Sequence, residues 1–158
     1  MKAKKPGDSK AEMTVRMFPT DANPAGNIFG GEILKQIDTV AGIVAQRHCE
    51  TNAVTASIDR VNFLKPVYVG NVLDLHAQIN YVHRSSMEIE ITVEAENLRT
   101  GKKALTGTAF VTMVALDDNG KPTPVPELVL ETDDEKKRFK EGEKRMQQRI
   151  SERKKSKV

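Results

Sequence analysis

The strongest hydrophobic pattern in the chain begins at two glycines, Gly30 and Gly31. From there to about His48, apolar residues recur at spacings of three and four positions, which is the period of one helix face. Polar residues are few along this stretch, so most of the helix surface must be buried against other elements. The pattern predicts a long, mostly buried helix wrapped by a curved sheet. Its apolar positions are Ile33, Leu34, Ile37, Val40, Ala41 and Val44.

Alternation of apolar and polar residues predicts five strands. In the fourth, Glu or Thr occupies every second position from Glu88 onward, so one face should meet solvent. The fifth is apolar or small on both faces, as in a central strand or a strand at a subunit contact. The predicted strands span about 12–17, 54–63, 73–82, 87–96 and 104–116.

The second predicted strand changes phase. Val54, Ala56 and Ile58 alternate with polar residues, and the pattern resumes one position late after Asp59-Arg60, which predicts a β-bulge there. The later strands are joined by short connections, which favour antiparallel pairing. The predicted fold class is therefore α+β, with one long helix against a curved antiparallel sheet.

The two ends of the chain differ from the body. Residues 1–10 are rich in Lys with no apolar period and are predicted to be a mobile arm. Residues 11–130 form the single predicted domain. Thr132 and Glu135 have capping-box spacing, so 131–158 should hold a peripheral, charged C-terminal helix and tail.

The composition limits the compartments in which the protein could work and the kinds of partner it could bind. No apolar stretch approaches the roughly 20 residues that span a bilayer, and Cys49 is the only cysteine, so a cytoplasmic protein without membrane insertion is expected. Residues 136–158 hold eleven Lys or Arg and three Asp or Glu, so the body is mildly acidic although the net charge is +3. No nucleic-acid partner is expected for the body, and the basic tail is expected to be a solvated surface.

Several common chemistries lack the residues that they need. His48, His76 and His83 do not have metal-ligand spacing, and no phosphate-binding glycine loop is present. No metal and no cofactor are therefore expected. His48 and Cys49 are adjacent on a helix and point about 100° apart, so a buried structural cysteine is favoured over a Cys/His nucleophile.

Asp38 is the most unusual residue of the long helix. Its helical neighbours Leu34, Ala41 and Ala45 are apolar, so its carboxylate borders the buried face. A carboxylate in that position is a candidate general base. The alternatives are that it pairs with Lys35 or turns to solvent.

The segment before the helix offers hydrogen-bond donors. Gly30 and Gly31 at the helix start would expose backbone N–H groups suited to an oxyanion hole, and the alternative is that they serve close packing alone. Asn23, in a turn rich in Pro and Gly, could donate its amide to a carbonyl or a water, or could merely cap the turn.

Several motifs occur together and in order: Asp21-Ala22-Asn23-Pro24-Ala25-Gly26-Asn27-Ile28-Phe29-Gly30-Gly31-Glu32-Ile33-Leu34, then Asp38, Arg47-His48-Cys49, Val54-Thr55-Ala56-Ser57-Ile58-Asp59, Asn62-Phe63 and Ser85-Ser86-Met87-Glu88-Ile89-Glu90. Over residues 11–130 the chain resembles the hot-dog-fold acyl-CoA thioesterases, the branch of bacterial short- to medium-chain hydrolases and the brain-type cytosolic enzyme. The resemblance implies a long helix wrapped by a five- or six-stranded antiparallel sheet. It also implies a dimer with active sites between subunits and further association into a hexamer.

The resemblance also assigns roles. It implies that Asn23 and Asp38, from facing subunits, carry catalysis, with Asp38 activating water or attacking the thioester directly and the Gly30 and Gly31 amides receiving the oxyanion. The product CoA would leave as thiolate. Lys65, Arg84, Ser85 and Ser86 carry charges and hydroxyls suited to the phosphates of CoA, although exposed turn residues are common without any role.

Two other functions fit the same resemblance. A non-catalytic acyl-CoA-binding regulatory module is the main alternative, and the retention of Asn23 and Asp38 weighs against it. A hot-dog dehydratase would need a histidine beside the acid, and none precedes His48 along the helix. The preferred acyl chain length depends on how subunits meet and does not follow from the sequence.

Overall fold

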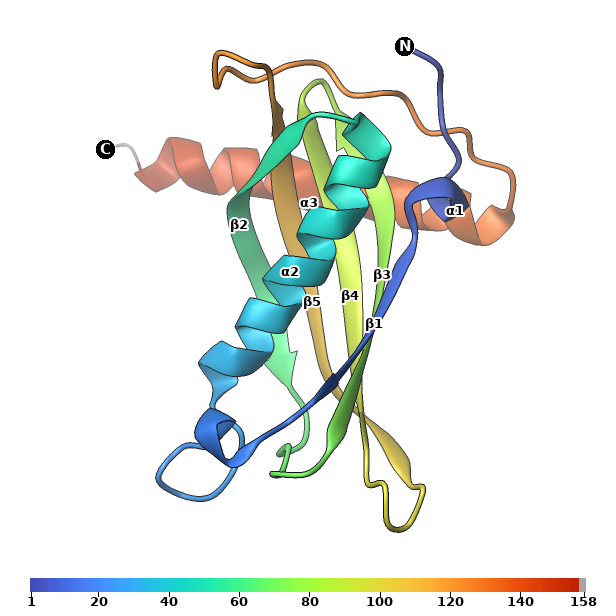
Figure 1. Ribbon diagram of the computed structural model, residues 1–158. Helices are drawn as coiled ribbons and strands as arrows, with labels where there is room; N and C mark the ends of the chain where they lie inside the picture. The colour runs from blue at the N-terminus through green and yellow to red at the C-terminus, as the bar shows by residue number, and fades with distance from the viewer. Residues whose placement is uncertain (157–158) are drawn as a thin grey trace.

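One five-stranded antiparallel sheet curves around one long helix in the computed structural model, which describes residues 1–156 (Figure 1). The strand order is β1-β3-β4-β5-β2, so β1 and β2 are the edges. The predicted hot-dog arrangement is confirmed. The strands are β1 Ala11–Arg16, β2 Asn52–Phe63, β3 Val72–His83, β4 Ser86–Glu96 and β5 Lys103–Leu116, and the helices are α1 Pro6–Ser9, η1 Pro19–Asp21 (3-10), α2 Gly30–Cys49 and α3 Asp133–Ser156.

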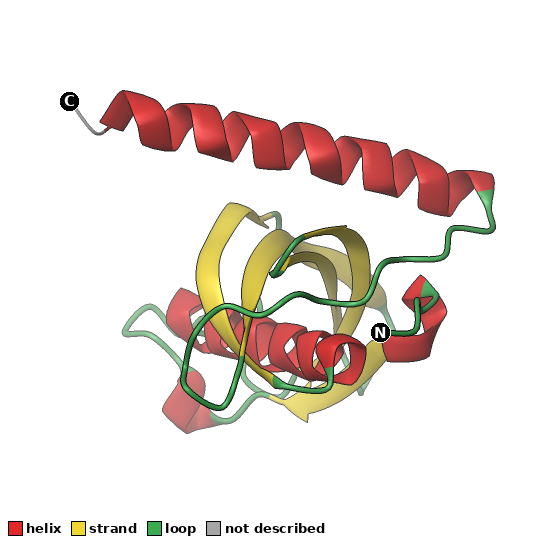
Figure 2. Cartoon of the chain, turned by 90° about the horizontal axis from the view of Figure 1, so that it is seen from above, coloured by secondary structure: helices red, strands yellow, loops and turns green. Residues whose placement is uncertain are grey.

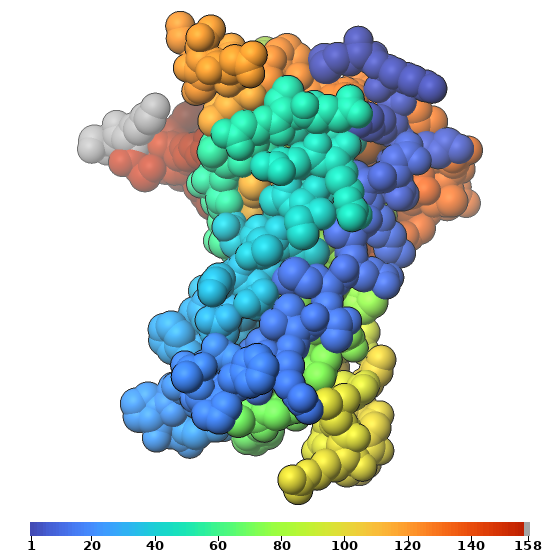
Figure 3. Space-filling model, viewed as in Figure 1, coloured from blue at the N-terminus to red at the C-terminus, as the bar shows by residue number. Residues whose placement is uncertain are grey.

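The core lies between α2 and the concave face of the sheet. Ile37, Val40 and Val44 of α2 are essentially inaccessible to solvent, as are Leu73, Leu75, Ile89, Ile91 and Val111 of the sheet. α2 ends as the chain turns into the left-handed region at Glu50, whose φ is 58°. The sheet covers only one side of α2, and the opposite side of the helix lies at the front of the space-filling view (Figure 3).

β2 contains two irregularities where the sequence predicted one. The pairing of β2 with β5 shifts between Asp59 and Asn62, where Arg60 has a φ of 49°, and this confirms the predicted bulge. A second shift lies between Thr55 and Ser57. The expected alternation of Val54, Ala56 and Ile58 is therefore wrong: Val54 is 43% exposed, whereas Ile58 packs against the core.

Part of the N-terminal segment, from Lys4 to Ser9, is packed against the body, in contrast to the predicted mobile arm. The Lys4 backbone exchanges hydrogen bonds with Glu127 and Val129, and the Lys4 Nζ donates to the Arg47 carbonyl at the end of α2. Pro6 begins the short helix α1, in which Pro6 and Ser9 are buried. Backbone pairing and burial of these small residues offset the high local charge.

α3 crosses the convex face of the sheet, on the side opposite α2 (Figure 2). The predicted cap is present, since the Glu135 N–H donates to Thr132 Oγ1 over 3.1 Å. The helix is not peripheral as expected, because Gly142 and Arg149 are buried against the sheet. For the same reason Glu88, expected on a solvated face, is fully buried.

Candidate active site

Asp38 lies on the side of α2 that faces the edge strand β2. Thr55 of β2 donates its hydroxyl to Asp38 Oδ1 over 2.5 Å. The Thr55 Oγ1 is also 3.4 Å from the Met113 sulfur, which places this side chain on the core-facing side of the sheet. The carboxylate thus has one oxygen held by a neutral donor, and its second oxygen has no hydrogen-bond partner within residues 1–156.

Thr55 is a candidate site residue that the sequence did not reveal. It lies in a motif used for the family resemblance, but no role was assigned to it because its face could not be known before the bulge at Ala56 was placed. Asp38 does not pair with Lys35, which was one of the expected alternatives. Within residues 1–156 the structure contains no ion pair between them.

The glycines at the start of α2 leave backbone donors free. Glu32 N–H donates to the Phe29 carbonyl, whereas the N–H groups of Gly30 and Gly31 have no partner in the described part of the chain. A Cβ on Gly31 would lie 2.3 Å from the Phe29 ring, so a side chain there would displace that ring. The Phe29 ring is exposed and could move, so this contact alone does not require glycine at 31. The two free donors lie at the positive end of the helix dipole.

Asn23 is held in a fixed orientation by its own loop. Its Oδ1 accepts the N–H groups of Ala25 and Asn27, over 3.0 and 3.2 Å. Because the oxygen is occupied by two backbone donors, the Nδ2 group must point the other way. This amide nitrogen has no acceptor within residues 1–156, so it is available to donate to a ligand.

Within one chain, Asn23 and Asp38 do not form one site. The loop that carries Asn23 projects beyond the N-terminal end of α2, at the lower left of Figure 1, whereas Asp38 lies two turns up the helix. No hydrogen bond joins the two side chains in the residues described. One chain therefore presents a carboxylate with its threonine at one place and an amide donor at another.

The four residues expected to bind CoA lie at two different ends of the sheet. Lys65 follows β2, near the start of α2, where Leu64 N–H donates to Thr106. The turn of Arg84, Ser85 and Ser86 adjoins the other end of β5, because Ser85 accepts the Ala115 N–H. At roughly 3.3 Å per strand residue, these ends are roughly 25 Å or more apart. One chain does not bring these residues together.

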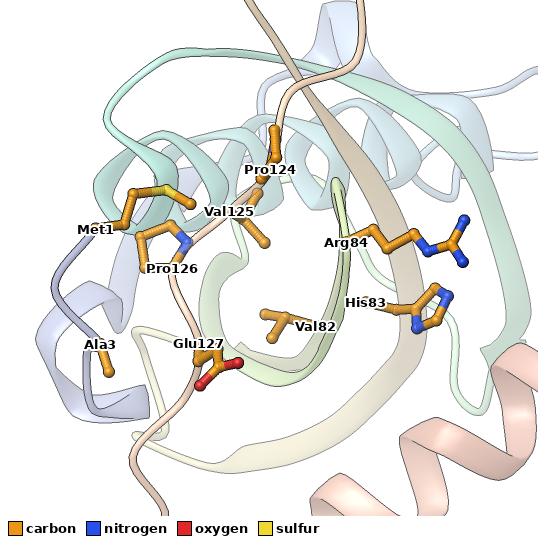
Figure 4. Close-up of a pocket in the computed structure, with 9 residues that line it drawn as sticks. All are labelled: Met1, Ala3, Val82, His83, Arg84, Pro124, Val125, Pro126 and Glu127. Carbon is orange, nitrogen blue, oxygen red and sulfur yellow. The ribbon is translucent and has the colours of Figure 1, made fainter.

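A pocket of about 530 Å³ lies beside the Arg84 turn (Figure 4). Its walls come from the N-terminal segment, from the end of β3 and from the segment of Pro124 to Glu127. Figure 4 shows the His83 and Arg84 side chains extending away from Met1 and Pro126. Neither Asn23 nor Asp38 lines it, so this hollow is separate from the candidate catalytic residues.

His48 is buried as a neutral structural group. Its Nε2 bonds to the Pro126 carbonyl over 2.7 Å, and its Nδ1 is buried without a partner. Burial lowers the pKa of His48, with the Pro126 hydrogen bond acting in the opposite direction. Cys49 bonds instead to Thr51, so the two neighbours do not form a nucleophilic pair.

The described residues show no metal centre and no membrane span. Within residues 1–156 no three His, Cys, Asp or Glu side chains are grouped closely enough to hold a metal ion. In the same range, no helix is long and apolar enough to cross a membrane.

Known proteins similar to this chain include thioesterases. Residues 25–102 match the model of the thioesterase superfamily. An uncharacterized acyl-CoA thioester hydrolase of Bacillus subtilis is 46% identical over 81% of this chain and 74% of its own length. The cytosolic acyl coenzyme A thioester hydrolase of Rattus norvegicus is 44% identical, and this chain spans 36% of its length.

Solved structures agree over nearly the whole chain. The crystal structure of an apo-hexameric acyl-CoA thioesterase has a TM-score of 0.90 and 37% identity, covering 96% of this chain and 97% of the other. The Staphylococcus aureus acyl-CoA hydrolase, solved with butyryl coenzyme A and coenzyme A, has a TM-score of 0.88 and 36% identity, covering 97% and 93%. That enzyme has also been solved with an aspartate, an asparagine or a threonine replaced by alanine.

The chain therefore belongs to the thioesterase superfamily, among the acyl-CoA hydrolases of the hot-dog fold. The family expected from the loop and helix motifs is confirmed. Relatives that assemble as hexamers also confirm the expectation of self-association.

Proposed function

We propose that this protein hydrolyses acyl-CoA thioesters to a free acid and CoA, with Asp38 as the general base. The observation that carries the proposal is the Thr55–Asp38 hydrogen bond of 2.5 Å at the edge of the core. In the Staphylococcus aureus enzyme, the replaced asparagine, aspartate and threonine are separated by the same numbers of positions as Asn23, Asp38 and Thr55 are here.

The geometry supports water attack. Thr55 holds Asp38 Oδ1, which leaves Oδ2 to accept a proton from a water molecule. The resulting hydroxide forms a bond to the thioester carbonyl carbon, and the oxygen gains the negative charge. When the tetrahedral adduct collapses, the C–S bond breaks and CoA leaves as thiolate, which takes up a proton from the site or from solvent. Direct attack by the carboxylate would instead form an anhydride that water then hydrolyses.

The oxyanion is stabilised by the free donors described above. The Gly30 and Gly31 N–H groups point along the helix axis from its positive end, and the Asn23 Nδ2 carries two more hydrogens. Because Asn23 and Asp38 are apart within one chain, we infer that Asn23 of one subunit serves Asp38 of another, in a dimer that associates further as a trimer of dimers.

The exposed edge of the sheet supports that assembly. β2 has twelve residues and no strand on its outer side, and long unprotected edges are uncommon in monomers. Large apolar side chains are also exposed near the C-terminal end of β2 and in the loops beside the start of α2. They are Phe18, Phe29, Phe63, Leu64, Tyr68 and Val69. A second subunit would bury both features.

The assembly also bears on CoA binding. Lys65 and the turn of Arg84, Ser85 and Ser86 are too far apart to contact the phosphates of one CoA within a chain, so we propose that they act from different subunits. We further propose fatty acyl-CoA of short to medium or broad chain length as substrate, no resident cofactor, and a cytoplasmic location.

Mixing inactive subunits tests the proposal. Asp38→Ala and Asn23→Ala should each abolish thiol release from butyryl-CoA. If the two residues meet between subunits, refolding an equal mixture of the two variants should restore about a quarter of wild-type activity, since half of the dimers are mixed and each has one intact site. Wild-type turnover in either variant would refute the role of that residue. No recovery on mixing, with mixed dimers demonstrated, would place both residues in one subunit.

A further inference from the structure

α3 is attached to the convex face of the sheet mainly through arginines. Arg138 pairs with Glu90, and Arg145 and Arg149 pair with Glu88 of the same strand, β4. The Arg145 guanidinium also lies 3.8 Å from the centre of the Phe110 ring. These contacts occupy the three arginines on the sheet side of the helix.

The middle of α3 approaches the sheet closely. A Cβ on Gly142 would be 2.6 Å from the Tyr81 Cβ and 3.1 Å from a Glu88 carboxylate oxygen. Glu88 is fully buried and Arg149 is 7% exposed. A buried carboxylate requires paired donors, and removal of one partner of such a group is costly. The helix is therefore held in one position.

Arg149 also reaches the edge strand. Its Nε and Nη2 bond to the two oxygens of Asp59 in β2, over 2.7 and 3.2 Å, while Nη2 bonds to Glu88 over 2.7 Å. This guanidinium thus joins an interior strand to the edge strand, across β5. Arg60 of β2 adds a contact to Gln148 of the same helix turn, over 2.6 Å.

The segment of β2 held by Arg149 adjoins Thr55. β2 has a strand neighbour on one side only, and its pairing with β5 is interrupted on both sides of the segment Ser57–Asp59. The first interruption, at Ala56, changes which face the side chains take. Thr55 therefore points toward α2 and Asp38, whereas Asp59 points toward α3 and Arg149.

We propose that Arg149 is a positioning residue for catalysis, acting through Asp59 to hold the segment of β2 that orients Thr55 toward Asp38. This inference rests on the proposed function. Two bulges leave the edge strand with fewer ladder bonds near Thr55, and the Arg149–Asp59 pair supplies the missing restraint from the opposite face of the sheet. Displacement of the threonine by even about 1 Å would cost catalysis without removing any group that touches substrate.

Arg149→Gln tests the proposal, with Arg138→Gln as the matched control. Both arginines come from α3 and pair with a buried or half-buried glutamate of β4, but Arg138 does not contact β2. Assays of the assembled protein at a temperature well below the melting transition of every variant should show a kcat about tenfold lower for Arg149→Gln, with KM changed less than about twofold. Arg138→Gln should keep the wild-type kcat.

A double-mutant cycle distinguishes positioning from general loosening. If Arg149 acts through Thr55, Arg149→Gln should reduce kcat much less in a Thr55→Val background than in the wild type. Asp59→Asn should give the same kcat effect and the same coupling, and it serves if Arg149→Gln does not fold. Arg149→Lys should restore part of the activity.

Two results would overturn the inference. One is an unchanged kcat in Arg149→Gln and Asp59→Asn, whatever the loss of melting temperature. The other is independent, multiplying effects of Arg149→Gln and Thr55→Val. Both leave the proposed function intact, because that depends on the loss of turnover in Asp38→Ala.

Discussion

The hydroxyl of Thr55 on β2 is 2.5 Å from the carboxylate of Asp38 on α2, and it is the only hydrogen bond to that carboxylate within residues 1–156. The bond joins the edge strand to the central helix at the point where the core ends. It fixes one carboxylate oxygen and so determines the direction in which the other can accept a proton.

Removal of the Thr55 hydroxyl should therefore impair catalysis more than folding. We expect Thr55→Val to lower kcat by about 10- to 100-fold, since proton transfer by a positioned base contributes about 10²–10⁴-fold. Thr55→Ser keeps the hydroxyl and should retain most activity. Steady-state kinetics with butyryl-CoA and thermal melts check this, and equal activity of the Val and Ser variants would contradict it.

The Asn23 amide can be tested without disturbing its loop. Asn23→Asp keeps an oxygen that accepts the Ala25 and Asn27 N–H groups but removes the Nδ2 donor. Because loss of one oxyanion donor costs about 10²–10³ in kcat, we expect a fall of that order with an almost unchanged melting temperature.

Asn71→Asp is the matched control for Asn23→Asp. Asn71 Oδ1 accepts the Tyr68 N–H in a nearby loop, over 2.9 Å, so the same chemical change is made at another asparagine whose side-chain oxygen holds a backbone N–H. Its kcat should stay near that of the wild type. A comparable loss in both variants would attribute the effect to the added charge.

Gly142 should tolerate no larger residue. Alanine favours a helix interior by about 1 kcal/mol over glycine, but a Cβ here would lie 2.6 Å from the Tyr81 Cβ. Overpacking typically costs about 1–3 kcal/mol, so we expect Gly142→Ala to lower the free energy of unfolding. Ser151→Ala, at an exposed position of the same helix, should be neutral or slightly stabilising. Urea titrations compare the two, and a stabilised Gly142→Ala would show that α3 does not pack as described.

Because His48 is buried, we expect the folded protein to lose stability in mild acid. Burial lowers its pKa in the folded state, whereas an unfolded histidine has a pKa of about 6.5. Between the lowered pKa and about 6.5 the unfolded chain binds more protons, so stability rises with pH through this window and is lost as the pH falls below about 6.5. Above about pH 6.5 the histidine is neutral in both states, so it no longer lowers the free energy of unfolding.

Urea unfolding at several pH values between about 5 and 7.5 measures this effect. His48→Gln keeps an amide donor for the Pro126 carbonyl and cannot be protonated, so it should flatten the pH dependence in that window. An unchanged slope in the variant would assign the acid sensitivity to other groups.

The helix and the strands followed from periodicity because their apolar positions repeat over many residues. The predicted helix from Gly30 to about His48 is α2, and Asp38 was singled out from its neighbours alone. The bulge at Asp59 was visible because the polar pair interrupts a regular alternation. The earlier bulge was not, because small residues such as Ala56 fit either face.

Other features depend on contacts between distant parts of the chain. Glu88 alternates with apolar residues as a solvated residue would, and only the arginines of α3, more than fifty positions away, make its burial tolerable. The role of Thr55 depends on the bulge, and the separation of Lys65 from Arg84 depends on strand direction. None of these is encoded locally.

The bulge at Ala56 lets one edge strand serve both faces of the sheet. Thr55 and Asp59 are four positions apart, so an unbroken strand that kept Ala56 would place both side chains on the same face, and either the Asp38 contact or the Arg149 pair would be lost. Deletion of Ala56 would instead preserve both directions, because the residues on either side of it already pair in continuous register with β5, from Met113 to Phe110. Insertions and deletions in this strand should therefore be judged by the face on which each side chain ends, and a gap of one position at 56 should be tolerated.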